Sequence, residues 1–99
     1  MKKIVLFCGA GMSSSLLVLK IRDAAIAANY DCKVEAYSAT NAQYAKDADI
    51  VLIGPQIRFN LKELEKGLSC PVVVIDEEAF GSMNGNKILA QARKILKDE

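Results

Sequence analysis

The sequence predicts a small α/β domain built on an open, four-stranded parallel sheet with helices on both faces. Short runs of hydrophobic residues, most of them β-branched, recur four times along the 99 residues, and stretches with helical spacing of apolar residues separate them. Such alternation produces βαβ units with right-handed crossovers, and therefore a parallel sheet. We expect the strand order 2-1-3-4 in a single domain that covers residues 1–99.

The four expected strands differ in their patterning. Three are continuous hydrophobic runs, as in strands covered on both faces: Lys3–Phe7, Ile50–Ile53 and Val72–Ile75. The fourth, Lys33–Tyr37, alternates apolar with charged residues, which is typical of an edge strand.

A long first helix of about five turns is expected after the first strand. Its apolar face comprises Leu16, Leu17, Ile21, Ala24, Ala25 and Ala28, with Lys20 as the one polar residue among them.

Two further helices and one weaker helical turn are expected. Asn60 followed by Glu63 has the pattern of a capping box and opens a helix whose apolar face is Leu61, Leu64 and Leu68. A terminal amphipathic helix follows the start signal Asn84-Gly85 and carries Ile88, Leu89, Ala92, Ile95 and Leu96. The weaker turn falls at Asn41–Lys46.

The composition excludes several function classes. Thirteen Lys and Arg oppose 12 Asp and Glu, so nothing favours a nucleic-acid or anionic-membrane partner. The absence of His removes the commonest general base and the imidazole ligands of many metal sites. The three cysteines form no CxxC pair and are odd in number, so we expect reduced thiols, no metal and no cofactor. Without an apolar span of membrane length, the chain is expected to be cytoplasmic.

The segment after the first strand is the best candidate site. Cys8 is expected to end that strand, and Gly9, Ala10, Gly11, Met12, Ser13, Ser14 and Ser15 lead from it into the long helix. Glycines permit positive φ angles, and a helix N-terminus offers unpaired N–H groups, so this turn predicts an anion cradle. The same surroundings are expected to lower the pKa of the Cys8 thiol and to make it a nucleophile.

Three known phosphate-binding loops do not fit this segment. A Walker A loop requires Lys beside its second glycine, and a dinucleotide fingerprint requires Gly at position 14, where Ser14 stands. The tyrosine phosphatase loop, Cys-x5-Arg, has the nearest geometry but also requires Arg at position 14. Without that guanidinium, a phosphoryl group in transfer lacks its strong clamp. We therefore expect a thiolate that accepts a phosphoryl group and passes it on.

Other residues are expected at the same carboxyl edge of the sheet. Gln56 and Arg58, after the third strand, are candidates for contacts with a phosphoryl group or a partner. Asp76 to Glu78 are expected to be solvated or to cap a helical turn. Cys32 and Cys70 are expected to open the second and fourth strands, at the opposite end, in structural roles.

The segment from Cys8 to Ser15 resembles the phosphorylation loop of the IIB component of the sugar phosphotransferase system, lactose/cellobiose (chitobiose) class. The similarity extends over the whole chain, including its length, its βα order and the loop from Gly54 to Phe59. The family often has Ser at the position of Gly9, so this chain lacks one hydroxyl there. The overall fold resembles that of the small tyrosine phosphatases and the flavodoxin-like proteins.

This resemblance implies a complete reaction. Cys8 would accept a phosphoryl group from a phosphohistidine of the IIA partner and donate it to a β-linked disaccharide bound by the membrane IIC permease. The protein would be a cytoplasmic phosphotransferase that associates transiently with the permease, without metal. The sugar stays open among cellobiose, chitobiose, lactose and a plant-glucan fragment. The alternatives are a small cysteine-dependent phosphatase and a non-enzymatic phosphate-sensing module.

Overall fold

The computed structural model describes residues 1–7, 11–37 and 45–98, with only the main chain of residues 11–14. In chain order the elements are β1 (Lys2–Phe7), α1 (Gly11–Ala27), β2 (Cys32–Tyr37), β3 (Ile50–Ile53), the 3-10 helix η2 (Pro55–Asn60), α2 (Leu61–Gly67), β4 (Val72–Val74), α3 (Glu77–Gly81) and α4 (Gly85–Leu96). The strands form one parallel sheet in the order β2-β1-β3-β4, which confirms the predicted fold class and strand order.

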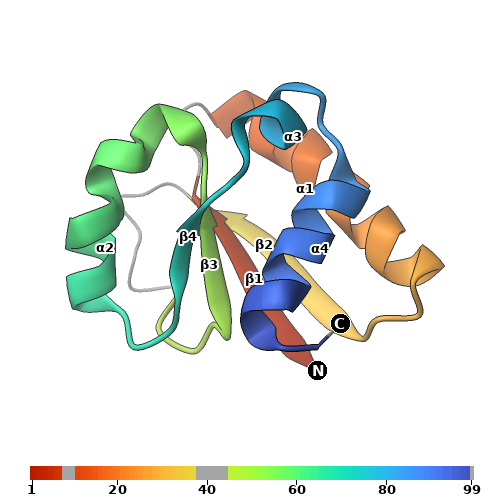
Figure 1. The fold of residues 1–99 in the computed structure, drawn as a ribbon, viewed down its shortest axis with the longest axis horizontal. Helices are drawn as coiled ribbons and strands as arrows, with labels where there is room; N and C mark the ends of the chain where they lie inside the picture. The colour runs from red at the N-terminus through yellow and green to blue at the C-terminus, as the bar shows by residue number, and fades with distance from the viewer. Residues whose placement is uncertain (8–10, 38–44, 99) are drawn as a thin grey trace.

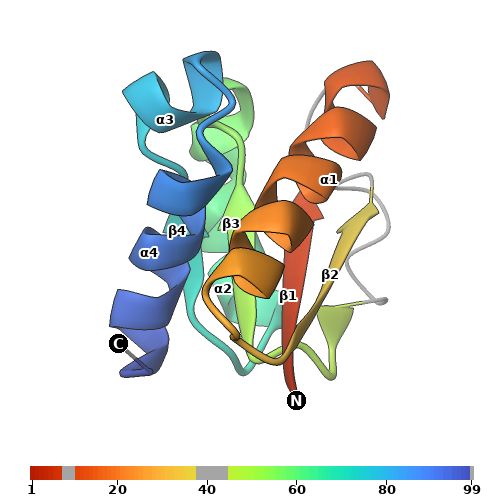
Figure 2. The same cartoon turned by 90° about the vertical axis from the view of Figure 1, so that its right-hand side faces the viewer.

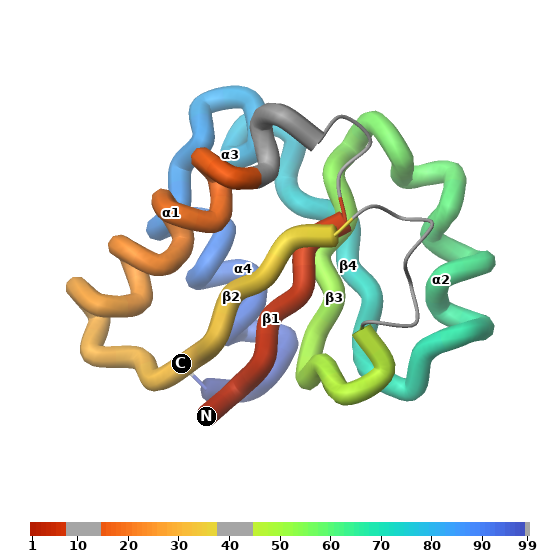
Figure 3. The backbone as a smooth tube through the Cα atoms, turned by 180° about the vertical axis from the view of Figure 1, so that it is seen from behind, coloured from red at the N-terminus to blue at the C-terminus, as the bar shows by residue number. Residues whose placement is uncertain are grey.

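The sheet is covered on both faces, in three layers. Helices α1 and α4 lie on one face and α2 lies on the other (Figures 1 and 2). Alternate residues of β1 serve the two layers, so that Ile4 and Leu6 pack with α1 and α4, whereas Val5 and Phe7 pack on the side of α2. The inner strands β1 and β3 read as uninterrupted apolar runs because both of their faces are buried. The two termini lie at the same end of the molecule, at the amino end of β1 (Figure 3).

The buried face of α1 differs from the predicted one. Val18 is buried, whereas Leu16 is 48% exposed and Lys20 is also exposed. Lys20 therefore lies outside the buried apolar face and does not interrupt it. Apolar residues are spread around most of this helix, so their spacing alone could not single out the side that packs on the sheet.

The helix starts confirm one predicted cap and correct another. Asn84 caps α4, where its side-chain oxygen accepts a hydrogen bond from the N–H of Lys87 at 3.0 Å. Asn60 precedes α2 as predicted, but its side chain makes no capping hydrogen bond. A capping residue needs an extended main chain. Asn60 has helical angles (φ −86°, ψ 0°) because η2 runs directly into α2.

Two further predictions are decided only in part. The weak helical turn at Asn41–Lys46 lies largely outside the described residues. Across the residues that the structure does describe, none of the helices is both long enough and apolar enough to span a membrane.

Candidate functional site

The candidate site follows β1 at the carboxyl edge of the sheet. Cys8, Gly9 and Ala10 lie outside the described residues, but the elements on either side of them are defined. β1 ends at Phe7 and α1 begins at Gly11. The chain then passes outward to β2 and returns to β3 on the other side of β1. In open parallel sheets, ligands bind outside the carboxyl ends of the strands at such a reversal of strand order.

Helix α1 begins earlier than the predicted cradle implies. Gly11 is already helical and no described glycine has a positive φ, so the flexibility expected of Gly11 is not used. The residues from Gly11 to Ser15 therefore belong to the first turns of α1. The N–H groups of a helix's first turn have no partner within the helix, so this end of α1 presents main-chain donors toward the β1–α1 connection.

The charge at the start of α1 is not neutralised by its own first turn. No acidic residue lies in the first turn of α1, whereas α2 has Glu63 there and α3 has Glu77 and Glu78. A helix N-terminus carries a partial positive charge that favours an anion nearby. Helix α4 also has no acid in its first turn, but the side-chain oxygen of Asn84 caps its start.

The segment after β3 carries the two other predicted contact residues. Gln56 and Arg58 lie on η2 and both are exposed. The Gln56 side chain turns back over Gly54, since a Cβ added to Gly54 would lie 2.8 Å from Gln56 Oε1. Buried Ile57 fixes η2 to the core, which leaves its neighbours directed outward.

Phe59 belongs to this edge as well and was not singled out from the sequence. Its side chain is 78% exposed, directly after Arg58 on η2. A single exposed apolar ring is ordinary on a protein surface, so the exposure of Phe59 alone assigns it no role. The sequence signal that could have identified Phe59 is an aromatic residue in a segment that directly follows a buried strand.

The acidic residues after β4 have structural roles, as predicted. Asp76 caps α3, accepting a hydrogen bond from the N–H of Ala79 at 3.1 Å. Lys87 Nζ lies 3.8 Å from a carboxylate oxygen of Asp76 and 3.8 Å from one of Glu78. These carboxylates are therefore engaged in a cap and in exposed ion pairs, and none is buried as a general acid would be.

Gln91 of α4 holds the end of β4, a role that the sequence did not indicate. Its Nε2 donates to the carbonyl of Val74 at 3.0 Å, and its Oε1 accepts from the N–H of Asp76 at 3.1 Å. The side-chain amide thus supplies the pair of hydrogen bonds that a neighbouring strand would supply. No spacing or composition signal distinguishes this glutamine from an ordinary surface residue.

The other two cysteines lie at the amino end of the sheet, as predicted. Cys32 is the first residue of β2, and Cys70 lies two residues before β4. Burial raises the pKa of both thiols, which disfavours the thiolate. Within residues 1–7, 11–37 and 45–98, no group of His, Cys, Asp or Glu side chains could hold a metal ion.

Comparisons with known proteins agree with this topology and give the family of the chain. Residues 3–91 match the family described as PTS system, Lactose/Cellobiose specific IIB subunit. The chain is 39% identical to the oligo-beta-mannoside-specific EIIB component of Bacillus subtilis (strain 168) over 97% of both chains. It is 35% identical to the cellobiose-specific EIIB component of Lactococcus lactis subsp. lactis (strain IL1403) over 96% of both chains.

Two solved structures share the fold. The cellobiose-specific phosphotransferase IIB component of Borrelia burgdorferi superposes with a TM-score of 0.78 at 38% identity, covering 98% of this chain and 93% of its own. The lactose-specific IIB domain of Streptococcus pneumoniae superposes with a TM-score of 0.80 over 94% of this chain and 95% of its own, at 15% identity, and so supports the fold alone. With strand order, helix layers and sequence in agreement over nearly the whole length, the chain belongs to the lactose/cellobiose-specific IIB family of the sugar phosphotransferase system, whose members are phosphotransferases.

Proposed function

We propose that Cys8 is the phosphoryl acceptor of this protein. Its thiolate attacks the phosphohistidine of a IIA partner, so that the P–N bond breaks, an S–P bond forms and the imidazole leaves. Gly9, Ala10, Gly11, Met12, Ser13, Ser14 and Ser15 form the phosphate cradle, through main-chain N–H groups and serine hydroxyls. The observation that carries this proposal is the connection between β1 and α1. It is three residues long, lies at the reversal of strand order, and leads into a helix without an acid in its first turn.

The second half of the reaction transfers the phosphoryl group to a sugar. A hydroxyl of a β-linked disaccharide, of the cellobiose, chitobiose or lactose type and held by the membrane IIC permease, attacks the phosphocysteine. An O–P bond forms, the S–P bond breaks, the Cys8 sulfur leaves as a thiolate and the hydroxyl proton is released. The domain, residues 1–99, acts in the cytoplasm, associates transiently with the permease, and uses neither metal nor cofactor. The relatives are named for oligo-β-mannosides, galactose and cellobiose at similar identity, which fits a sugar choice made largely outside this chain.

Gln56 and Arg58 are proposed to contact the phosphoryl group or the partner proteins. Both are exposed on η2, which follows β3, the neighbour of β1. The exposed guanidinium of Arg58 can steer a phosphorylated, negatively charged partner toward this edge, because charge complementarity chiefly raises association rates. An Arg58→Ala variant should therefore accept phosphate more slowly, with a larger effect at low salt.

Intact-mass spectrometry tests the proposal directly. The protein is incubated with phosphoenolpyruvate, the general phosphotransfer proteins and a IIA partner. We expect a single phosphoryl adduct that is lost in Cys8→Ser and retained in the matched variants Cys32→Ser and Cys70→Ser. A wild-type chain that gains no adduct from a competent IIA partner would refute the role of Cys8.

A second measurement separates the proposal from its alternatives. The wild-type protein is incubated with an aryl phosphate, and released phosphate is followed. We expect no turnover, because no Arg stands at position 14 to stabilise the transferring group. Turnover that disappears in Cys8→Ser would favour a phosphatase. Phosphate binding without any adduct would favour a sensing module.

A further inference from the structure

Gly54, directly after β3, has a main-chain conformation that does not require glycine. Its φ and ψ angles are −66° and 148°, an extended conformation, and Pro55 follows it. Residues that precede proline favour extended conformations of this kind, and alanine adopts them without strain. The space beside its Cα atom, rather than its backbone, is therefore what distinguishes glycine from alanine at this position.

The space beside Gly54 is occupied by an amide and bordered by an aromatic ring. A Cβ added to Gly54 would lie 2.8 Å from Oε1 of Gln56, which is closer than nonbonded atoms of this kind pack. The same Cβ would lie 3.4 Å from Cε1 and 3.5 Å from Cζ of Phe80, on α3, at ordinary contact distances. Alanine at position 54 would therefore displace the Gln56 amide and leave the Phe80 ring in place.

The two neighbours of Gly54 differ in how easily they move. Gln56 is exposed and has a flexible, unbranched side chain, whereas Phe80 is half-buried against the core on the α1 side of the sheet. The displaced amide can rotate into solvent without disturbing the core. Gly54→Ala is thus expected to keep the fold and to change the position of one side chain.

Gly54 also connects this amide to the end of β1. The N–H of Gly54 donates to the carbonyl of Phe7 at 3.0 Å, and Phe7 is the last residue of β1. The connection that carries Cys8 starts at the next residue. The Gln56 amide, turned back over Gly54, therefore lies beside the starting point of the proposed phosphate cradle.

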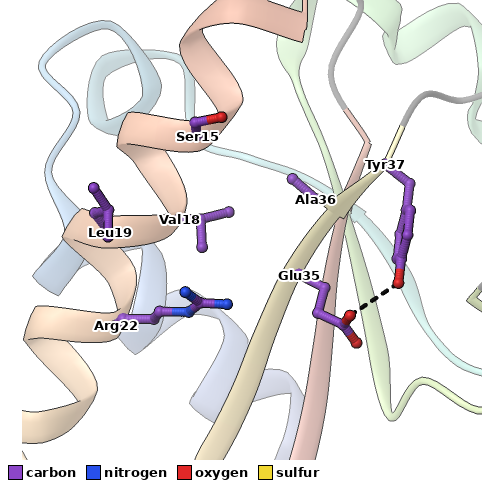
Figure 4. A pocket seen from close by; sticks show the side chains of 7 residues that line it. All are labelled: Ser15, Val18, Leu19, Arg22, Glu35, Ala36 and Tyr37. Atoms are coloured by element: carbon purple, nitrogen blue, oxygen red, sulfur yellow. Dashed lines mark hydrogen bonds between the residues drawn. The ribbon is translucent and has the colours of Figure 1, made fainter.

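The Gln56 amide is available to a ligand, unlike two other polar side chains at the carboxyl ends of the strands. At the end of β2, the Tyr37 hydroxyl donates to Glu35 Oε2 at 2.9 Å (Figure 4), and after β4 the Asp76 carboxylate caps α3. The Gln56 side chain has no hydrogen-bond partner among the residues that the structure describes. Its NH2 group can therefore donate to an oxygen of a phosphoryl group.

We propose that Gly54 is a positioning residue, which leaves room for the Gln56 amide to lie beside the end of β1, where the amide donates to the phosphoryl group in transfer. This role rests on the proposed function of Cys8, and it assigns Gln56 to the phosphoryl group rather than to a partner protein. A donor held where charge develops in the transferring group lowers the barrier to transfer. Gly54 does not touch that group and acts only through Gln56.

The rate of phosphoryl acceptance tests this proposal. A phosphorylated IIA partner is mixed with each variant, and intact-mass spectrometry follows the adduct after rapid quenching. We expect Gly54→Ala and Gln56→Ala each to accept the group about tenfold more slowly than wild type, which is the scale of one hydrogen bond to a charged group. Gly67→Ala adds a methyl group where no heavy atom lies within 4 Å, and should match wild type.

The double variant Gly54→Ala/Gln56→Ala shows whether Gly54 acts through Gln56. It should accept the group no more slowly than Gln56→Ala, because the second change removes nothing that remains. A double variant in which the two losses multiply would overturn the proposal.

Two measurements that do not depend on phosphoryl transfer separate positioning from a structural role. The midpoint of urea unfolding of Gly54→Ala should equal or exceed that of wild type, because the backbone accepts alanine. In wild type, nuclear Overhauser effects should join side-chain protons of Gln56 to the α protons of Gly54, and they should be lost in Gly54→Ala. A lowered midpoint, or a wild type without these effects, would overturn the proposal.

The role of Cys8 and the role of Gly54 can fail separately. A wild type that gains no adduct from a competent IIA partner refutes both. A wild type that gains the adduct at the same rate as Gly54→Ala refutes the positioning role of Gly54 and leaves the role of Cys8 standing.

Discussion

Gly85→Ala is the substitution for which the structure gives the clearest stability prediction. Gly85 is the first residue of α4 and lies against the main chain of α1. A Cβ at this position would collide with the carbonyl oxygen and the carbonyl carbon of Lys20 and would lie 3.0 Å from the nitrogen of Ile21. These atoms belong to a helix backbone and cannot rotate away. The two helices must therefore separate by about 1 Å, which forfeits up to about half of the dispersion energy of the contacts that open.

The size of the effect follows from two opposing contributions. Overpacking of a core typically costs about 1–3 kcal/mol, and an obstruction by backbone places this site at the upper end. Alanine recovers about 0.5–1 kcal/mol because it restricts the unfolded chain. We expect a net loss of about 2 kcal/mol in the free energy of unfolding, and a fall in Tm of about 10 °C for a domain of this length.

Matched glycine variants make this prediction refutable. Gly67→Ala and Gly81→Ala alter helical glycines with no heavy atom within 4 Å of the added Cβ. Both should leave stability unchanged or raise it by about 0.5 kcal/mol. Thermal and urea unfolding, followed by circular dichroism, measure all three variants. If Gly85→Ala unfolds with the same midpoints as these controls, the close approach of α1 and α4 does not exist as described.

Three further predictions concern the polar contacts and the thiols. The Tyr30 hydroxyl donates to Asp98 Oδ2 at 2.7 Å, and the centre of the Tyr30 ring lies 4.7 Å from the guanidinium of Arg93. Tyr30→Phe should keep the stacking on Arg93 but lower the free energy of unfolding, measured in urea, by about 1 kcal/mol because the hydrogen bond is lost. An unchanged unfolding midpoint would contradict this. The hydrogen bond from Lys3 lowers the pKa of Asp47 below its ordinary value of 3.8. A lowered pKa adds stability above the ordinary pKa that is lost as the pH falls through the folded pKa. Lys3→Met should therefore be less stable than wild type at pH 7, and the difference should shrink as the pH falls below 3.8 and vanish once Asp47 is protonated in both proteins. A difference that persists in acid would point to lost packing instead. Finally, Cys8 should react with iodoacetamide faster than Cys32 and Cys70, whose thiol pKa values are raised by burial, and peptide mapping that finds equal rates would contradict an activated thiol at the start of α1.

Sheet order and helix positions could be predicted because they follow from local patterns. Uninterrupted apolar runs such as Ile50–Ile53 occur where both faces of a strand are covered, and the alternation in Lys33–Tyr37 occurs where one face is less covered than the other. The start of α4 could also be predicted, because Asn84 makes the capping hydrogen bond that its position in the sequence suggests. Asn60 shows the limit of such rules, because a preceding 3-10 helix removed the extended main chain that a cap requires.

The chemistry of the candidate site stays a prediction from residue types, and its surroundings could be predicted less well. Cysteine, glycine and serine between a strand and a helix indicate an anion cradle without reference to any contact. Exposed Phe59, on the other hand, depends on Ile57 anchoring η2, and the role of Gln91 depends on where α4 crosses the end of β4. The contacts of Gln91 join residues 15 and 17 positions apart in the sequence, so no local pattern records them.

The sequence by itself determined the fold class, the strand order, the family and the position of the candidate nucleophile, because each of these rests on residue types at short spacing. Only the tertiary structure decided which side of α1 is buried, why position 85 must be glycine, and that Arg22 lies over the free edge of β2. The physical reason is that helix α1 has apolar residues on several sides, and the choice among them depends on which neighbour it packs against. That packing buries Leu17, Val18 and Ile21 and leaves Leu19 and Ile26 exposed on the outer side of the helix.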